Sequence, residues 1–164
     1  MPKWNEVRLE DVEIDPGSGR SRPKFRLGLG PLKFQIPRGT CTWGVSPEYK
    51  TFQVGIQDEA FVEWYETLEK KLCSDVPFHS NLKEGSLRLK VDDSTLFFRS
   101  DGSLLVDGAD RMKGADVSCI LEIPGSWFYQ EKYGLTCRCA QVRIWSEVVP
   151  GSPPMARRLL LDED

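Results

Sequence analysis

The chain has 164 residues, enough for one domain with a sizeable hydrophobic core. Its 40% hydrophobic and 29% charged residues are typical of a soluble globular protein, and no apolar run approaches membrane-spanning length. The net charge of −3 argues against a simple polycationic nucleic-acid binder, although the acids gather in residues 58–72 and near both ends, which leaves a mildly basic body. The first residues lack an apolar signal core, so we expect an intracellular protein that is neither secreted nor bound to a membrane.

Residues 1–31 are weakly patterned, and the Gly- and Ser-rich stretch 15–23 predicts a flexible N-terminal arm. This arm could be a swapped strand, a contact in a homodimer, or disordered. Residues 32–149 form the expected body. Gly and Pro punctuate segment 38–47, which we expect to be a loop. Alternating apolar and polar residues predict strands at 32–36, 49–56, 86–91, 95–99, 103–106, 117–123, 126–130 and 133–145.

One amphipathic helix is predicted at residues 58–73. Asp58 can cap its N-terminus, and Lys70 and Lys71 suit the negative end of the helix dipole. Its acidic side is expected to face solvent. A single apolar stripe with helical spacing is expected to pack in the core: Phe61, Trp64, Tyr65, Leu68 and Leu72.

The strand at 133–145 is the longest with clear alternation. Apolar side chains occupy every second position as far as Cys139, and the phase then shifts by one residue to Val142 and Ile144. Such a shift predicts a β-bulge near residues 140–141, a common way to bend a strand around a small barrel. Short strands, frequent turns and one inserted helix together predict a mainly β fold, namely an OB-like closed or partly open β-barrel.

Metal or cofactor chemistry has little support in the sequence. Five cysteines at irregular spacing suggest buried thiols rather than a disulfide framework, and the pair Cys137 and Cys139 is too close for a zinc knuckle. The single histidine, His79, has no partner motif. We therefore expect no metal, no cofactor and no enzymatic activity. A metal-dependent enzyme remains the least favoured alternative, and its candidate ligands are acid pairs that usually form turns: Asp92 with Asp93, and Asp107 with Asp110.

Four segments carry a family resemblance by their order. They are IPRG at 36–39 with GVS at 44–46, a strand followed by the amphipathic helix, LRLKV at 87–91, and KGADV at 113–117 followed by Trp127 and YGLTCRCAQVRI at 133–144. Over residues 32–145 the chain resembles the OB-fold single-stranded-DNA-binding proteins of large DNA viruses and, more distantly, those of tailed phages. The resemblance implies non-sequence-specific binding of single-stranded DNA in replication or recombination.

Residues 150–164 predict a Pro/Gly linker and an acidic C-terminal tail. Most chain termini have no function. The functional interpretation is a peptide that docks on a replication protein, as the resemblance implies, or that covers the basic groove of its own domain. This chain lacks the aromatic residue with which such tails commonly end. The residues expected to contact a partner are Leu159, Leu160, Leu161, Asp162, Glu163 and Asp164.

A groove for single-stranded DNA needs cations for phosphates and exposed rings for base stacking. Arg88 and Lys90 are the preferred phosphate contacts because they share an outward strand face. No motif reads duplex base edges. The alternative function is a protein-interaction β-module without nucleic acid, which the net acidity favours. The cations considered for DNA binding are Arg38, Lys50, Lys83, Arg88, Lys90, Arg99, Lys113, Arg138 and Arg143. The rings considered are Trp43, Tyr49, Phe98, Trp127, Tyr129 and Tyr133.

Overall fold

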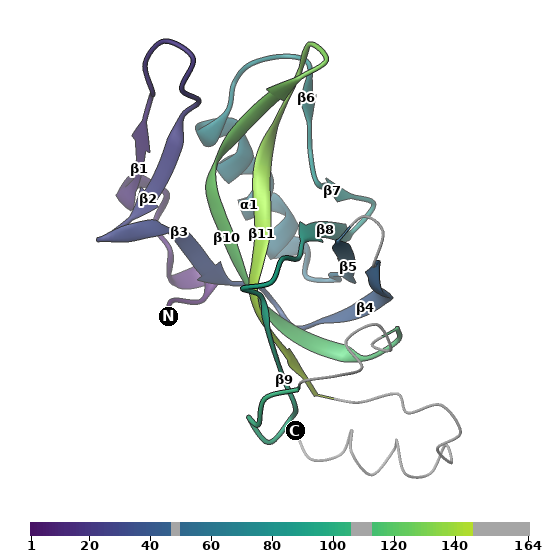
Figure 1. The fold of residues 1–164 in the computed structure, drawn as a ribbon. Coiled ribbons are helices and arrows are strands. Elements are labelled where there is room, and N and C mark those ends of the chain that lie inside the picture. Colours follow the sequence, from purple (N-terminus) through teal and green to yellow (C-terminus); the bar gives the residue numbers. More distant parts are fainter. Residues whose placement is uncertain (47–49, 106–112, 146–164) are drawn as a thin grey trace.

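The computed structural model describes residues 1–46, 50–105 and 113–145, which form a mainly β protein with one α-helix (Figure 1). None of the described helices is long and apolar enough to cross a membrane. Two short 3-10 helices, η1 (Trp4–Glu6) and η2 (Leu9–Asp11), precede the first strand. The other elements are β1 (Val12–Asp15), β2 (Lys24–Leu27), β3 (Gly30–Gln35), β4 (Gly39–Ser46), β5 (Thr51–Gly55), α1 (Glu59–Leu72), β6 (Phe78–His79), β7 (Leu82–Lys83), β8 (Ser86–Lys90), β9 (Leu96–Phe98), β10 (Asp116–Tyr129) and β11 (Lys132–Ile144).

The strands belong to one sheet that curls into a partly closed ring. Its order is β1-β2-β3-β10-β4-β5-β8-β11-β6, with β7 paired to β8 and β9 paired to β11. Because β10 also pairs with β11, strands β10, β4, β5, β8 and β11 follow one another around a circuit. This arrangement, with the helix between β5 and β8, confirms the expected OB-like fold.

The hairpin of β10 and β11 is the longest pairing in the sheet. It runs through the middle of the view in Figure 1, from its turn near β6 to its end beside β9. The partner of Ile120 is Gln141 and the partner of Leu121 is Cys139, so Ala140 is an extra residue on β11. The predicted β-bulge is therefore confirmed. Because of it, Arg138 and Arg143 point to the same outer face although five positions separate them.

Helix α1 packs its apolar side into the core, as the spacing predicts. The Asp58 carboxylate accepts a hydrogen bond from the Phe61 amide at 3.1 Å and caps the helix. Trp64 lies edge-on to Phe34 of β3, with the ring centroids 5.1 Å apart. Glu69 differs from the expected solvent-facing acids, because it is buried and its carboxylate accepts a 2.6 Å hydrogen bond from the Ser80 hydroxyl.

Residues 1–31 are more ordered than the expected flexible arm. They contain β1 and β2, and their side chains Val7, Val12 and Phe25 lie in the core. The apolar residues are spaced too widely among polar ones to show a period, so sequence patterning underestimates this segment.

The segment expected to be a loop at 38–47 forms strand β4. A Cβ atom at Gly39 would lie 2.4 Å from the Gly55 carbonyl oxygen, so this glycine allows close approach of two strands rather than a turn. Segments 117–123 and 126–130, expected as two strands, are one strand, β10. All five cysteines are buried free thiols, as the sequence predicts.

Candidate nucleic-acid interface

Three residues predicted to bind DNA come together at one pocket on the outside of the ring. This pocket, here the β8 pocket, has a volume of about 340 Å³ and collects side chains from β5, β8, β10 and β11. Arg88, Lys90 and Trp127 all line it. The complete lining is Thr51, Asn81, Arg88, Leu89, Lys90, Trp127, Leu135, Thr136 and Cys137.

The two cations owe their position to the alternation of β8. Leu87 and Leu89 are buried, so Arg88 and Lys90 face outward and are exposed. The Asn81 side chain donates to the Arg88 carbonyl at 3.0 Å, while the Arg88 amide donates to the Asn81 carbonyl at 2.9 Å. These bonds fix the backbone of β8 beside the pocket. Within residues 1–46, 50–105 and 113–145 neither cation has an ion-pair partner, so both charges remain open to an anion.

Trp127 is held in place by a glycine on the neighbouring strand. Gly134 is its register partner, and a Cβ atom there would lie 2.2 Å from Cζ2 of the indole. The ring therefore rests directly on the backbone of β11. Tyr129 lies two residues further along β10, on the same face, and is 68% exposed. The two rings thus extend the β8 pocket toward the hairpin turn.

The hairpin turn itself is tight. Gln130 and Glu131 have φ values of 50° and 61°, as in the two-residue turns that suit a β-hairpin. Tyr133 lies on the other face of the hairpin, where its ring is 4.8 Å from Phe128 and 5.3 Å from the Arg22 guanidinium. Of the three predicted rings in the hairpin, Tyr133 is therefore apart from Trp127 and Tyr129.

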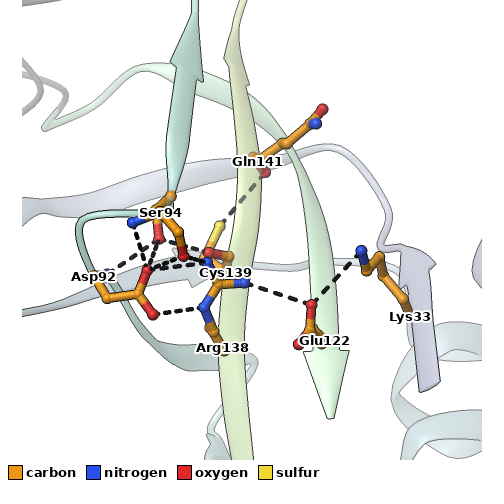
Figure 2. Close-up of polar contacts among 8 residues, drawn as sticks. Lys33, Asp92, Ser94, Glu122, Arg138, Cys139 and Gln141 are labelled. Atoms are coloured by element: carbon orange, nitrogen blue, oxygen red, sulfur yellow. Dashed lines mark hydrogen bonds and ion pairs between the residues drawn. The ribbon is translucent and has the colours of Figure 1, made fainter. Parts of the chain in front are cut away.

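Arg138, also predicted to bind DNA, is engaged by carboxylates (Figure 2). Its Nε and Nη2 donate to the two oxygens of Asp92 at 2.6 and 2.9 Å, and Nη1 lies 3.5 Å from Glu122 Oε2. Glu122 also pairs with Lys33 at 3.7 Å, and Arg138 donates to the Ser94 hydroxyl. The bidentate hydrogen bonds from Arg138 hold the pKa of Asp92 well below its usual range. Two cations and two carboxylates cancel, so this Arg138 cluster is neutral.

A second pocket lies toward the end of β11 and is called the β11 pocket. It has a volume of about 300 Å³. The Arg143 guanidinium lies 4.2 Å and that of Arg38 4.8 Å from the Trp145 ring centroid, distances typical of cation–π contacts. The Trp145 indole nitrogen donates to the Ser118 hydroxyl at 2.7 Å. The pocket is lined by Gln35, Phe98, Gly102, Ser118, Cys119, Ile120, Gln141, Val142, Arg143 and Trp145.

Trp145 is a candidate that sequence reasoning missed. Two predicted cations, Arg38 and Arg143, converge on it from β11 and from the segment between β3 and β4. The only local signal is that Trp145 follows Arg143 by two residues, so both fall on the outer face after the bulge. Nothing local connects either residue with Arg38.

The remaining candidates lie outside both pockets. Lys50, Lys83, Arg99 and Lys113 are exposed. Trp43 is in β4, where its backbone pairs with Gln53. Tyr49, Asp107, Asp110 and the tail from Leu159 to Asp164 lie outside the described residues. Among the residues that are described, no three His, Cys, Asp or Glu side chains are grouped so as to hold a metal ion.

The two pockets and the Arg138 cluster occupy one continuous outer face. Along β11, Thr136 lines the β8 pocket, Arg138 follows it, and Arg143 lines the β11 pocket. Seven residue steps from Thr136 to Arg143 correspond to about 23 Å of strand. The face therefore offers cationic and aromatic groups at its two ends and a neutral polar cluster between them.

No family model and no curated protein matches this sequence. Solved structures do share the fold. The single-stranded DNA-binding protein from bacteriophage Enc34 in complex with ssDNA is 10% identical, with a TM-score of 0.54 over 83% of this chain and 96% of that chain. The same protein, solved as a C-terminal truncation, has a TM-score of 0.55 at 9% identity, over 88% of this chain and 98% of that chain. At such identities the likeness establishes the fold, and it agrees with the phage part of the resemblance expected from the sequence.

Proposed function

We propose that this protein binds single-stranded DNA, without sequence specificity, along the outer face of β11. The observation that carries the proposal is the meeting of Arg88, Lys90 and Trp127 in the β8 pocket. Cations beside a ring that is open to solvent are what a non-specific single-strand binder requires. The shared fold with a phage single-stranded DNA-binding protein supports the same conclusion.

In the proposed complex, the strand lies across the sheet, and its two chemical parts are bound separately. Arg88 and Lys90 contact successive phosphates. Trp127 and Tyr129 stack on bases, each stacked base contributing about 1–3 kcal/mol. Since phosphates and base faces are common to every sequence, neither contact reads sequence.

We place this binding in DNA replication or recombination, in an intracellular protein of viral type. The acidic tail, residues 159–164, docks on replication proteins or covers the basic groove until DNA displaces it. A second copy of the chain is a further candidate partner. These parts of the proposal extend the implications of the sequence resemblance.

A binding titration tests the proposal. Fluorescent oligo(dT) of about thirty nucleotides, a duplex and an RNA of equal length are titrated at about 50 and 200 mM salt. We expect preference for the DNA single strand and affinity that falls with salt. Failure of the full chain and of a chain ending at residue 149 to bind any single strand would favour the protein-interaction alternative.

Paired variants locate the site. Arg88→Gln with Lys90→Gln removes two phosphate contacts, so the slope of log K against log salt should become shallower by about 1.4. Lys70→Gln with Lys71→Gln is the control, because it removes the same charge from α1, none of whose residues lines either pocket. Equal effects of the two pairs would remove the β8 pocket from the binding site.

A further inference from the structure

A row of two amides and one aliphatic side chain crosses the sheet at the β11 pocket. Ile120 of β10 has Gln35 of β3 as its register partner on one side and Gln141 of β11 on the other. All three line the pocket. Neighbouring strands lie about 4.8 Å apart, so the two glutamines flank the isoleucine at a separation of about 10 Å. The pocket thus has an apolar floor between two amide groups.

The two amides are available to a ligand. In the part of the chain that the structure describes, neither side chain has a hydrogen-bond partner. Gln141 is exposed and Gln35 half-buried, so both are reachable from solvent. Each primary amide carries two donors and an acceptor, the groups that nucleobases present along their edges. Phe98 and Trp145 add aromatic walls. At about 300 Å³, the pocket is at the small end of ligand sites.

Positive charge stands at the mouth of the same pocket. Arg143 donates from Nε to the Ser100 carbonyl at 3.2 Å, and its Nη2 donates to the same oxygen. These bonds and the Trp145 ring fix the guanidinium, and its Nη1 has no hydrogen-bond partner among the described residues. Arg38 adds a second charge against the same indole. A phosphate bound here would lie beside, and not inside, the apolar part of the pocket.

We propose that the β11 pocket binds one nucleobase of the bound single strand, turned out of the base stack. Gln35 and Gln141 hydrogen-bond its edge, and Arg143 binds a flanking phosphate. This inference rests on the proposed function and adds a second binding mode to it, since the β8 pocket uses ring faces and the β11 pocket uses base edges. Because amide groups can rotate to present either donor or acceptor, the pocket distinguishes a base from no base rather than one base from another.

The test compares two strands of equal length and charge. One is oligo(dC) of about twelve nucleotides, within the range that one OB fold covers, and the other is the abasic strand. We expect Gln35→Ala with Gln141→Ala to weaken binding of oligo(dC) by about 10- to 30-fold, as the loss of two hydrogen bonds predicts. Binding of the abasic strand should change less than about twofold. Gln57→Ala is the control, because Gln57 is exposed and lines neither pocket.

A second readout uses the unmodified protein. The NMR signal of the Trp145 indole N–H, identified by its loss in Trp145→Phe, should shift with oligo(dC) and stay in place with the abasic strand. Equal losses on both strands, or none on either, would overturn the inference. So would free dCMP that binds as tightly as the strand, because the site would then belong to a mononucleotide. If the unmodified protein binds neither strand, the proposed function itself fails.

Discussion

The Arg138 cluster makes a specific prediction about DNA affinity. Asp92 occupies two donors of Arg138 at 2.6 and 2.9 Å, so the guanidinium is neutralised in the middle of the proposed binding face. Asp92→Asn removes the carboxylate and keeps the shape of the side chain. The Asp92 side chain is 51% exposed, so the lost ion pair should cost the folded state at most about 1 kcal/mol. Arg138 then becomes available for one additional phosphate.

The size of the effect follows from counterion release. Each phosphate contact contributes about 0.7 to the salt slope for a single strand. Relative to 1 M salt, one added contact strengthens binding about eightfold at 50 mM and about threefold at 200 mM. Fluorescent oligo(dT) titrations across this range measure both the gain and its decline with salt.

Asp93→Asn is the matched control for this prediction. Asp93 is the next residue, is exposed, and makes no contact with Arg138. It therefore reports the long-range effect of removing one negative charge. Equal gains for Asp92→Asn and Asp93→Asn would show that releasing Arg138 adds no phosphate contact, and the reasoning would be refuted.

Three further changes test other parts of the structure. Gly134→Ala would place a Cβ 2.2 Å from the Trp127 ring, so it should lower the free energy of unfolding by about 1–3 kcal/mol and weaken oligo(dT) binding; unchanged stability and affinity would refute the ring position. Burial raises the pKa of Glu69 from 4.5 to about 7, so wild-type stability should fall as pH rises from about 4.5 to 7. Glu69→Gln should abolish this fall, worth about 1–3 kcal/mol in chemical denaturation, whereas the exposed control Glu63→Gln should keep it. Deleting residues 155–164 should tighten oligo(dT) binding at low salt if the tail covers the groove, and unchanged affinity would exclude covering.

Sequence patterns predicted the features that depend on neighbours along the chain. The spacing of Phe61, Tyr65 and Leu68 defines α1, and the phase shift after Cys139 locates the bulge. Alternation alone turns Arg88 and Lys90 outward. Each of these depends on a period that a short window contains.

Contacts between distant segments were not predictable from one sequence. Arg38 and Arg143 meet at Trp145 although 105 positions separate the two arginines (143 minus 38). The Arg138 side chain is drawn to Asp92, which is 46 residues away. The glycine in β4 resembles a turn signal, and only the approach of Gly55 shows why it is needed in a strand. Such pairings are set by how the sheet closes.

The interruption between β8 and β9 has a consequence for acid tolerance. After the Lys90–Arg138 pair the backbone leaves β11 and rejoins it at Leu96, so side chains bridge the gap. The Thr95 hydroxyl donates to the Cys139 carbonyl at 2.7 Å, and Asp92 holds Arg138. Because the pKa of Asp92 lies below its usual 3.8, this join stays ionised in mild acid, where Glu69 is also protonated and content to be buried. The two groups together place the greatest contribution to folding stability at about pH 4 to 5, well below neutrality.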